Sequence, residues 1–305
     1  MPALITTLGA ITRDDLGVIL PHEHVFVDLR TWDQPGYSDA ETDDVVRLMT
    51  PEIEAARAAG VTAIVEPSGI GVGRRADILL AVSRATGFPL VAPTGVYREP
   101  WLPPWVRDAS EDSLRTWMIG ELTGQIEGTG VQAGWIKVAA TDEGITDSES
   151  KVLRAAAGAS AATGATIGSH TLRGAVAREQ IAILEGAGGS ADHFVWIHAH
   201  QELDVAIHHE LARQGVWIEY DGIGDEGSDP MFIDLIHRAL DAGLAHRLLL
   251  SQDRGWYDPA QPGGGTPKPF TYLSETFLPK LAASGVDDVT IGQLMRDNPF
   301  AAFAR

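Results

Sequence analysis

The amino-acid sequence predicts a (β/α)8 barrel, an α/β fold, with residues 1–305 forming one domain. β-type runs alternate with helix-type segments along the whole chain, and eight runs of the first kind are found. The length suits one barrel, since such domains commonly reach about 250 residues and can be longer. A doubly wound open sheet is the alternative fold. It would carry a glycine-rich phosphate-binding turn after the first strand, where this chain has Pro21-His22-Glu23-His24.

The eight expected strands are short and rich in apolar residues. They lie at residues 18–20 running into 22–24, 62–66, 89–94, 134–138, 165–169, 193–198, 216–220 and 247–251. The strands of a barrel run parallel, so their carboxyl ends meet on one face, where barrel enzymes carry their active sites.

The segments between these strands have apolar residues at helical spacing. Seven helices are expected at 43–59, 75–86, 111–127, 148–163, 177–186, 203–214 and 230–242, followed by a helical region at 272–304. In the seventh helix Ile233, Ile236 and Leu240 form one face, and Asp234 and Arg238 lie on the other.

The composition narrows the classes of function. With 23 Lys+Arg and 42 Asp+Glu, the chain has a net charge of −19 when its histidines are neutral. We therefore expect it to bind neither nucleic acid nor an anionic membrane through broad positive charge. No apolar run is long enough for a membrane-spanning helix, and the N-terminal residues do not resemble a secretory signal, so a cytoplasmic protein is expected. Because there is no cysteine, any metal must use His, Asp, Glu or a less usual ligand.

Candidate ligands stand at the carboxyl ends of the expected strands. His22 and His24 are two residues apart, which places both imidazoles on one side of a strand. The other strand ends contribute Lys137, His170, His198 and Asp253. Imidazoles and carboxylates without sulfur suit zinc, manganese, cobalt or iron. An His-x-His pair alone arises by chance, so the prediction depends on the convergence of the strand ends.

Lys137 needs a special explanation, because a charged ammonium is a poor ligand. Its neighbours Trp135, Ile136 and Val138 are apolar, and such surroundings lower the pKa of an amine. A neutral amine can add carbon dioxide to become a carbamate, which bridges two cations as a carboxylate does. The alternative is that Lys137 is a buried salt-bridge partner.

Taken together, these residues resemble the phosphotriesterase family of the amidohydrolase superfamily, which includes phosphotriesterase-like lactonases. The resemblance covers nearly the whole chain, from Leu8-Gly9 to Asn298-Pro299. Its motifs are His22-Glu23-His24, Gly71-Val72-Gly73-Arg74, Thr94-Gly95-Val96-Tyr97, Ile136-Lys137, Gly168-Ser169-His170-Thr171 and Ser251-Gln252-Asp253. The His-x-His motif is weak alone, whereas the ordered set on one barrel is specific.

The resemblance implies a centre of two divalent metal ions, expected to be zinc, with manganese, cobalt or iron as alternatives. One ion would lie on His22, His24 and Asp253, the other on His170 and His198, with carboxylated Lys137 and a hydroxide bridging them. The hydroxide would be the nucleophile. Asp253 would take its proton, and the second ion would polarise the substrate's oxygen.

The sixth strand offers two histidines on one face. We assign His198 as the ligand because its spacing to Asp221 resembles that of the family. His200 is expected on the substrate side or behind the ligands, and a ligand role for His200 in place of His198 is the alternative. Family members often have the pattern Gly-His-x-x-Asp at this strand, and its Asp relays protons. The relay commonly also uses a His or Arg directly after the residue that corresponds to Asp221. This chain has Gln201 and Gly222 at the relay positions, so the resemblance does not predict its relay residues or its substrate.

Substrate-binding residues are expected on the loops after the third and eighth strands. Tyr97 matches a tyrosine that related enzymes place beside the metals, and Trp256 follows closely after Asp253. Arg254 would either bind an anionic group of the substrate or pair with Glu219 or Asp221. The proline-rich loop with Trp101 and Trp105 would form an apolar pocket wall, pack on itself or contribute to a homodimer interface.

Other polar residues are expected to have no role in chemistry. His208 and His209 are adjacent on the sixth helix and are expected on a solvated face. Glu23 should point away from His22 and His24 and orient backbone or a basic partner, and Glu66 is expected to support the site from behind.

The sequence thus favours a hydrolase that acts on a lactone or related carboxylic ester, a small-molecule substrate. A phosphotriester or phosphodiester hydrolase is the alternative, because the same hydroxide can attack phosphorus. A non-catalytic metal-binding barrel is disfavoured, since every ligand position of the family pattern is filled.

Overall fold

Parallel strands form the wall of the barrel in the computed structural model, which describes residues 1–305. The strands in order are β3 (Val18–Leu20), β5 (Val61–Val65), β6 (Leu90–Val91) with β7 (Pro93–Thr94), β8 (Trp135–Ala139), β9 (Ile167–His170), β10 (Phe194–Ile197), β11 (Trp217–Tyr220) and β12 (Leu248–Leu250). β3, β5 and β6 pair in one sheet, and β7 to β12 pair successively in another. The predicted strand at 89–94 is therefore divided, with its first part paired to β5 and its second to β8. This arrangement confirms the (β/α)8 barrel.

The wall is closed between β12 and β3 by residues just beyond the two strands. The His22 N–H donates to Ser251 Oγ at 3.0 Å, and the Asp253 N–H donates to the His22 carbonyl at 3.2 Å. The closing contacts therefore involve two of the predicted metal ligands.

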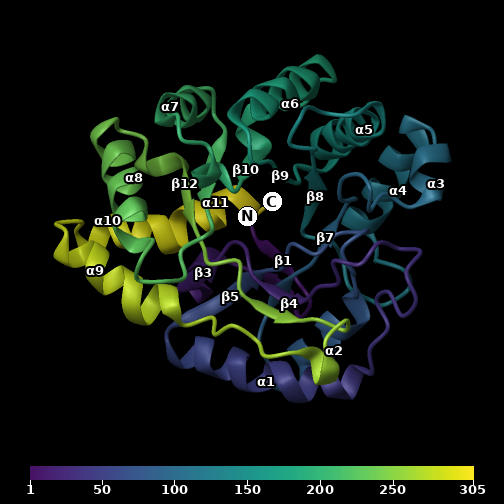
Figure 1. Cartoon of the computed structure of the whole chain (residues 1–305), viewed down its shortest axis with the longest axis horizontal. Coiled ribbons are helices and arrows are strands. Elements are labelled where there is room, and N and C mark those ends of the chain that lie inside the picture. The colour runs from purple at the N-terminus through teal and green to yellow at the C-terminus, as the bar shows by residue number, and fades with distance from the viewer.

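All seven predicted helices are present and surround the strands in Figure 1. They are α1 (Thr42–Ala58), α2 (Ala76–Thr86), α4 (Glu111–Thr123), α5 (Asp147–Thr163), α6 (Gly174–Gly186), α7 (Val205–Arg213) and α8 (Asp229–Asp241). α4 ends four residues before the predicted 127. No helix of the chain is both long and apolar enough to cross a membrane.

The remaining elements were not resolved by sequence reasoning, except for the helical C-terminal region. Besides five helices of three residues each, they are the hairpin β1 (Leu4–Thr6) and β2 (Gly9–Ile11), the strands β4 (His24–Phe26) and β13 (Gly255–Tyr257), α3 (Pro104–Asp108), and the C-terminal helices η6 (Leu273–Phe277), α9 (Leu278–Ala283), α10 (Asp288–Gly292), η7 (Gln293–Asp297) and α11 (Asn298–Phe303). β4 and β13 pair in parallel, with His24 opposite Gly255. This pairing holds the loop after β12 beside the His22-x-His24 segment.

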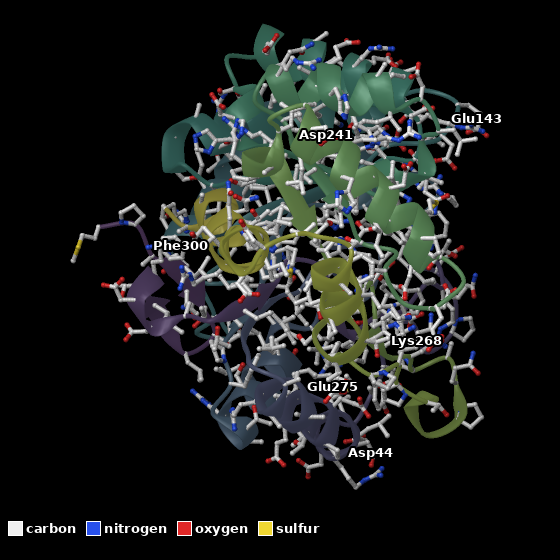
Figure 2. The ribbon with its side chains drawn as sticks, turned by 90° about the vertical axis from the view of Figure 1, so that its left-hand side faces the viewer. Asp44, Glu143, Asp241, Lys268, Glu275 and Phe300 are labelled. Atoms are coloured by element: carbon white, nitrogen blue, oxygen red, sulfur yellow. The ribbon has the colours of Figure 1, made fainter.

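The barrel interior is apolar at its amino-terminal end. Trp135 on β8 is fully buried there and meets Phe303 of α11 edge to face, with the ring centroids 5.2 Å apart. Phe300 of the same helix and Lys268 lie on opposite sides of the molecule in Figure 2. Because alternate residues of a strand share a face, Lys137 points into the barrel above Trp135. The charged and imidazole side chains of the predicted site therefore lie beyond this apolar layer, toward the carboxyl-terminal end of the strands.

Candidate metal centre

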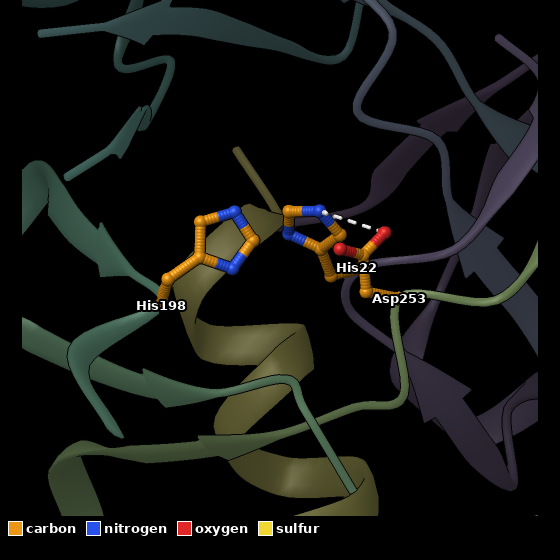
Figure 3. Close-up of side chains that lie close together, drawn as sticks. All are labelled: His22, His198 and Asp253. Carbon is orange, nitrogen blue, oxygen red and sulfur yellow. Dashed lines mark ion pairs between the residues drawn. The ribbon is translucent and has the colours of Figure 1, made fainter. Parts of the chain in front are cut away.

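Three of the predicted ligands meet at the barrel mouth. His22, His198 and Asp253 offer one ligand atom each within 4.8 Å of one another. Figure 3 shows these three side chains close together. Asp253 Oδ1 lies 3.9 Å from His22 Nε2 and 3.4 Å from His24 Nε2. One carboxylate oxygen thus faces both imidazoles of the His22-x-His24 pair.

The other predicted ligands complete the same cluster. The rings of His170 and His198 are 4.5 Å apart between centroids. All six predicted ligands line one cavity of about 150 Å³, together with Tyr97 and Trp256. The structure therefore brings together residues that the sequence places 231 positions apart, from His22 to Asp253.

Two of these residues have an unusual backbone conformation. His198 has φ 64° and Asp253 has φ 51°, and neither is a glycine. Val195 and Ile197 of β10 belong to the apolar barrel interior, so a regular strand would direct residue 198 outward. The left-handed conformation breaks this alternation and lets His198 turn into the cavity, at a cost of about 1–2 kcal/mol. Such strain concentrates at functional sites.

Three imidazoles are oriented by partners behind them. His22 Nδ1 lies 2.8 Å from Glu219 Oε1, His198 Nδ1 lies 2.7 Å from Asp221 Oδ1, and His24 Nδ1 lies 2.7 Å from Ser68 Oγ. Ser68 Oγ donates its only hydrogen to the Phe26 carbonyl, so it must accept one from His24 Nδ1. His24 Nε2 is then left with its lone pair toward the cavity, which is the usual arrangement of a metal-binding histidine.

Glu219 and Asp221 were predicted only as possible partners of Arg254, so sequence reasoning missed their contacts with His22 and His198. A signal was available. Trp217, Glu219 and Asp221 alternate along β11, and Trp217 packs in the barrel interior. This alternation would have placed both carboxyl groups inward, near the histidines. Burial raises the pKa of Glu219 well above its usual range. Glu66 accepts from the Val25 N–H and supports the site from behind, as expected.

Burial also sets the protonation of the nitrogen ligands. It lowers the pKa of His22 and of His170 well below the usual value, so both are neutral near pH 7. It lowers the pKa of Lys137 to about 8, although Glu219 and Asp253 oppose that change. Lys280 is the only lysine in an ion pair, so Lys137 is not the buried salt-bridge partner of the alternative interpretation. A substantial neutral fraction of its amine is present under mildly basic conditions.

These residues fit a divalent metal ion. His170 Nε2 and Asp253 Oδ1 are buried and have no hydrogen-bond partner, which is costly unless another group binds them. Neutral imidazoles with carboxylates and no sulfur suit zinc and its neighbours in the first transition series. The cluster is therefore a candidate metal site on chemical grounds alone.

The predicted substrate-side residues occupy different places. Tyr97 lines the 150 Å³ cavity and its ring centroid is 5.2 Å from that of His170. Trp256 lines both this cavity and a second one of about 440 Å³. The second cavity also shares His170, His198 and Asp253 with the first, and adds the polar residues His200, Gln201, Gln252 and Lys268.

His200 lies outside the cluster of ligand atoms, on the wall of the second cavity. Its Nδ1 is 3.5 Å from Asp221 Oδ1. A Cβ on Gly222 would lie only 2.5 Å from His200 Nε2. Gly222, which departs from the family pattern, therefore leaves room for the His200 ring.

Arg254 points away from both cavities. Its Nη2 donates to the Gly224 carbonyl, and its guanidinium lies 5.3 Å from the centroid of the Tyr272 ring. Its contacts connect the loop after β11 with the residue that follows Asp253. Arg254 therefore makes a structural contact, but its partner is the Gly224 carbonyl and not the predicted Glu219 or Asp221.

Comparison with known proteins agrees with this geometry. The family model described as "Phosphotriesterase family" matches residues 2–303. The chain belongs to the phosphotriesterase family. It is 31% identical over 293 residues to the phosphotriesterase homology protein of Escherichia coli, covering 95% of this chain and 99% of that protein.

Two further members of the phosphotriesterase family differ in the activity that their names state. The aryldialkylphosphatase of Saccharolobus solfataricus is 28% identical, over 97% of both chains. A mutant of the phosphotriesterase-like lactonase of Deinococcus radiodurans has a similar structure, with a TM-score of 0.87, 30% identity and coverage of 98% and 99% of the two chains. Together with the His and Asp cluster, family membership shows that this chain is a metal-dependent hydrolase.

Proposed function

We propose that the chain hydrolyses a lactone or related carboxylic ester at a centre of two divalent ions. The observation that carries this proposal is the gathering of six potential ligands around one cavity, two of them with buried ligand atoms that lack any other partner. Zinc is the expected metal, with manganese, cobalt or iron as alternatives. His22, His24 and Asp253 would hold one ion, and His170 and His198 the other, with carboxylated Lys137 shared between them.

When bound, the ions would provide hydroxide near neutral pH and polarise the substrate's oxygen. The chain's own groups would do the rest. The Asp253 carboxylate, which lines both cavities, would accept the proton released as the new bond forms. Glu219 and Asp221 would hold His22 and His198 in one tautomer, so that each presents Nε2 to the cavity.

The two cavities suggest how a substrate would lie. Val27, Leu29 and Val72 give the smaller cavity an apolar wall that suits an alkyl or acyl group. His200, Gln201 and Lys268 give the larger cavity polar groups for the oxygen-rich side of a lactone or ester. Tyr97 and Trp256 would pack against the substrate between them. Arg254 would act at the rim, by holding the loop after β11 in place.

A phosphotriester hydrolase is the second candidate. Its support is the aryldialkylphosphatase relative, which matches over 97% of both chains. The apolar wall of the smaller cavity could take an alkoxy group as readily as an acyl chain. The centre and its ligands would be the same for both reactions.

A hydrolysis panel tests the proposal. Metal-reconstituted protein would be assayed with γ- and δ-lactones, aryl esters and an aryl dialkyl phosphate, with Asp253→Asn and chelator-treated protein as controls. We expect lactones or esters to give the highest kcat/KM, and both controls to be inactive. A clear preference for the phosphate triester would favour the second candidate, and activity that survives both controls would contradict the proposed site.

A further inference from the structure

Glu23 lies between His22 and His24 in the sequence, yet its carboxyl group points away from the cavity that they line. The side chain is fully buried and is not part of the cavity wall. No step of the proposed reaction uses it. A buried carboxyl group is costly unless its oxygens are hydrogen-bonded, so its partners indicate its role.

Those partners stand on both sides of Asp253. Glu23 Oε1 accepts from Ser251 Oγ at 2.9 Å and from the Gln252 N–H at 3.0 Å, and Oε2 accepts from the Arg254 N–H at 2.7 Å. Gln252 Nε2 also donates to Oε1, at 3.3 Å. One side chain thus holds the residue before and the residue after Asp253.

Asp253 needs such support because it has φ 51°. A left-handed conformation costs a non-glycine residue about 1–2 kcal/mol, and it persists only where the surroundings over-determine it. The bonds to Glu23 on either side, and the bond from the Asp253 N–H to the His22 carbonyl, supply that constraint.

We propose that Glu23 is a positioning residue that fixes Asp253 against His22 and His24 and so sets the affinity of the ion held by these three residues. The proposal rests on the proposed metal centre. His170 is the last residue of β9, and His198 directly follows β10. Neither has a hydrogen bond to Glu23 or to residues 251–254. The ion that they would hold should therefore be insensitive to Glu23.

Glu23→Gln tests this selectivity. It preserves size, but its amide group must face a donor, so the bond from either the Gln252 or the Arg254 N–H is lost. Removing a partner that orients a ligand typically lowers metal affinity about 10–100-fold. Metal-free protein would be titrated with Zn²⁺ by calorimetry and with Co²⁺ by visible absorption. We expect two steps in the wild type, and in the variant one step weakened by this factor with the other unchanged.

Glu149→Gln is the matched control. Glu149 is also buried and accepts from backbone N–H groups, those of Glu99 and Thr146, but it lies outside both cavities. It should leave both steps unchanged. Ser251→Ala removes one bond to Glu23 together with the acceptor of the His22 N–H. Both losses act on the ion of His22, His24 and Asp253, so the same step should weaken, and an unweakened step would count against the proposal even if Glu23→Gln does not fold.

Two results would overturn the role of Glu23 alone: both steps weakening equally, or both staying at their wild-type affinity in Glu23→Gln and Ser251→Ala. A wild-type chain that binds no ion would instead overturn the proposed centre, and the role of Glu23 with it.

Discussion

Gly222 faces His200 so closely that an alanine at this position should destabilise the fold. The added Cβ would lie 2.5 Å from His200 Nε2 and 3.2 Å from Phe232 Cζ, whereas ordinary contacts begin at 3.4 Å. The imidazole would have to move by roughly 1 Å. It is confined, because its ring packs 5.2 Å from that of Phe232 and its Nδ1 lies 3.5 Å from Asp221.

The magnitude follows from two opposing effects. Overpacking of this kind costs about 1–3 kcal/mol, while replacing a glycine stabilises by about 0.4–1 kcal/mol through the unfolded chain. Gly222 does not have a positive φ, so its backbone conformation accepts alanine. We expect Gly222→Ala to lower the free energy of unfolding by about 1–2 kcal/mol.

A double-mutant cycle in urea, on metal-free protein, isolates the contact. In a His200→Ala background Gly222→Ala should become neutral or stabilising, which gives a coupling of about 1–3 kcal/mol. Gly120→Ala is the control, because nothing lies within 4 Å of its added Cβ, and its effect should be the same in both backgrounds. If Gly222→Ala costs the same with and without His200, the packing explanation is wrong.

Three further predictions concern other parts of the molecule. Burial lowers the pKa of His208 to about 4, so the unfolded chain takes up a proton at this residue before the folded chain does. The stability that is present above pH 6.5 should therefore fall by about 3 kcal/mol as the pH drops to 4. In thermal melts His208→Gln should flatten this pH dependence, whereas His246→Gln, at an exposed position, should not. Asp221→Asn should weaken metal binding about 10–100-fold by releasing His198, and unchanged calorimetric affinity would exclude that role. Light scattering should give twice the chain mass of 32.6 kDa for the predicted homodimer, and a monomer at micromolar concentration would refute it.

The barrel could be predicted because its pattern is local. Each strand is a short apolar run and each helix has its own amphipathic face, so β8 and the five other strands of its sheet were found within a few residues. The pairing of β4 with β13 was not found, because it joins residues 231 positions apart, as His24 and Gly255 show. Nothing in either short segment specifies the other.

The site was predictable to a similar extent. The strand-end rule placed His170 and Lys137 correctly in the cavity, since both continue the inward alternation of their strands. It could not predict the left-handed conformation of His198, which depends on contacts from other strands. The prediction for His208 was wrong: its ring is buried and hydrogen-bonds to the Tyr220 hydroxyl group and the Glu202 carbonyl. Adjacent helix residues face different directions, so His208 turns inward toward β11, whereas His209 is only half-buried.

The metal content of the wild type and of Lys137→Ala, measured by plasma mass spectrometry after loading with Zn²⁺ or Co²⁺, tests the central claim most directly. The proposed centre predicts close to two ions per wild-type chain. It also predicts loss of metal in Lys137→Ala, with partial recovery when a short carboxylic acid replaces the missing carbamate. A well-loaded wild type with almost no metal, or a Lys137→Ala variant with an unchanged content, would contradict it.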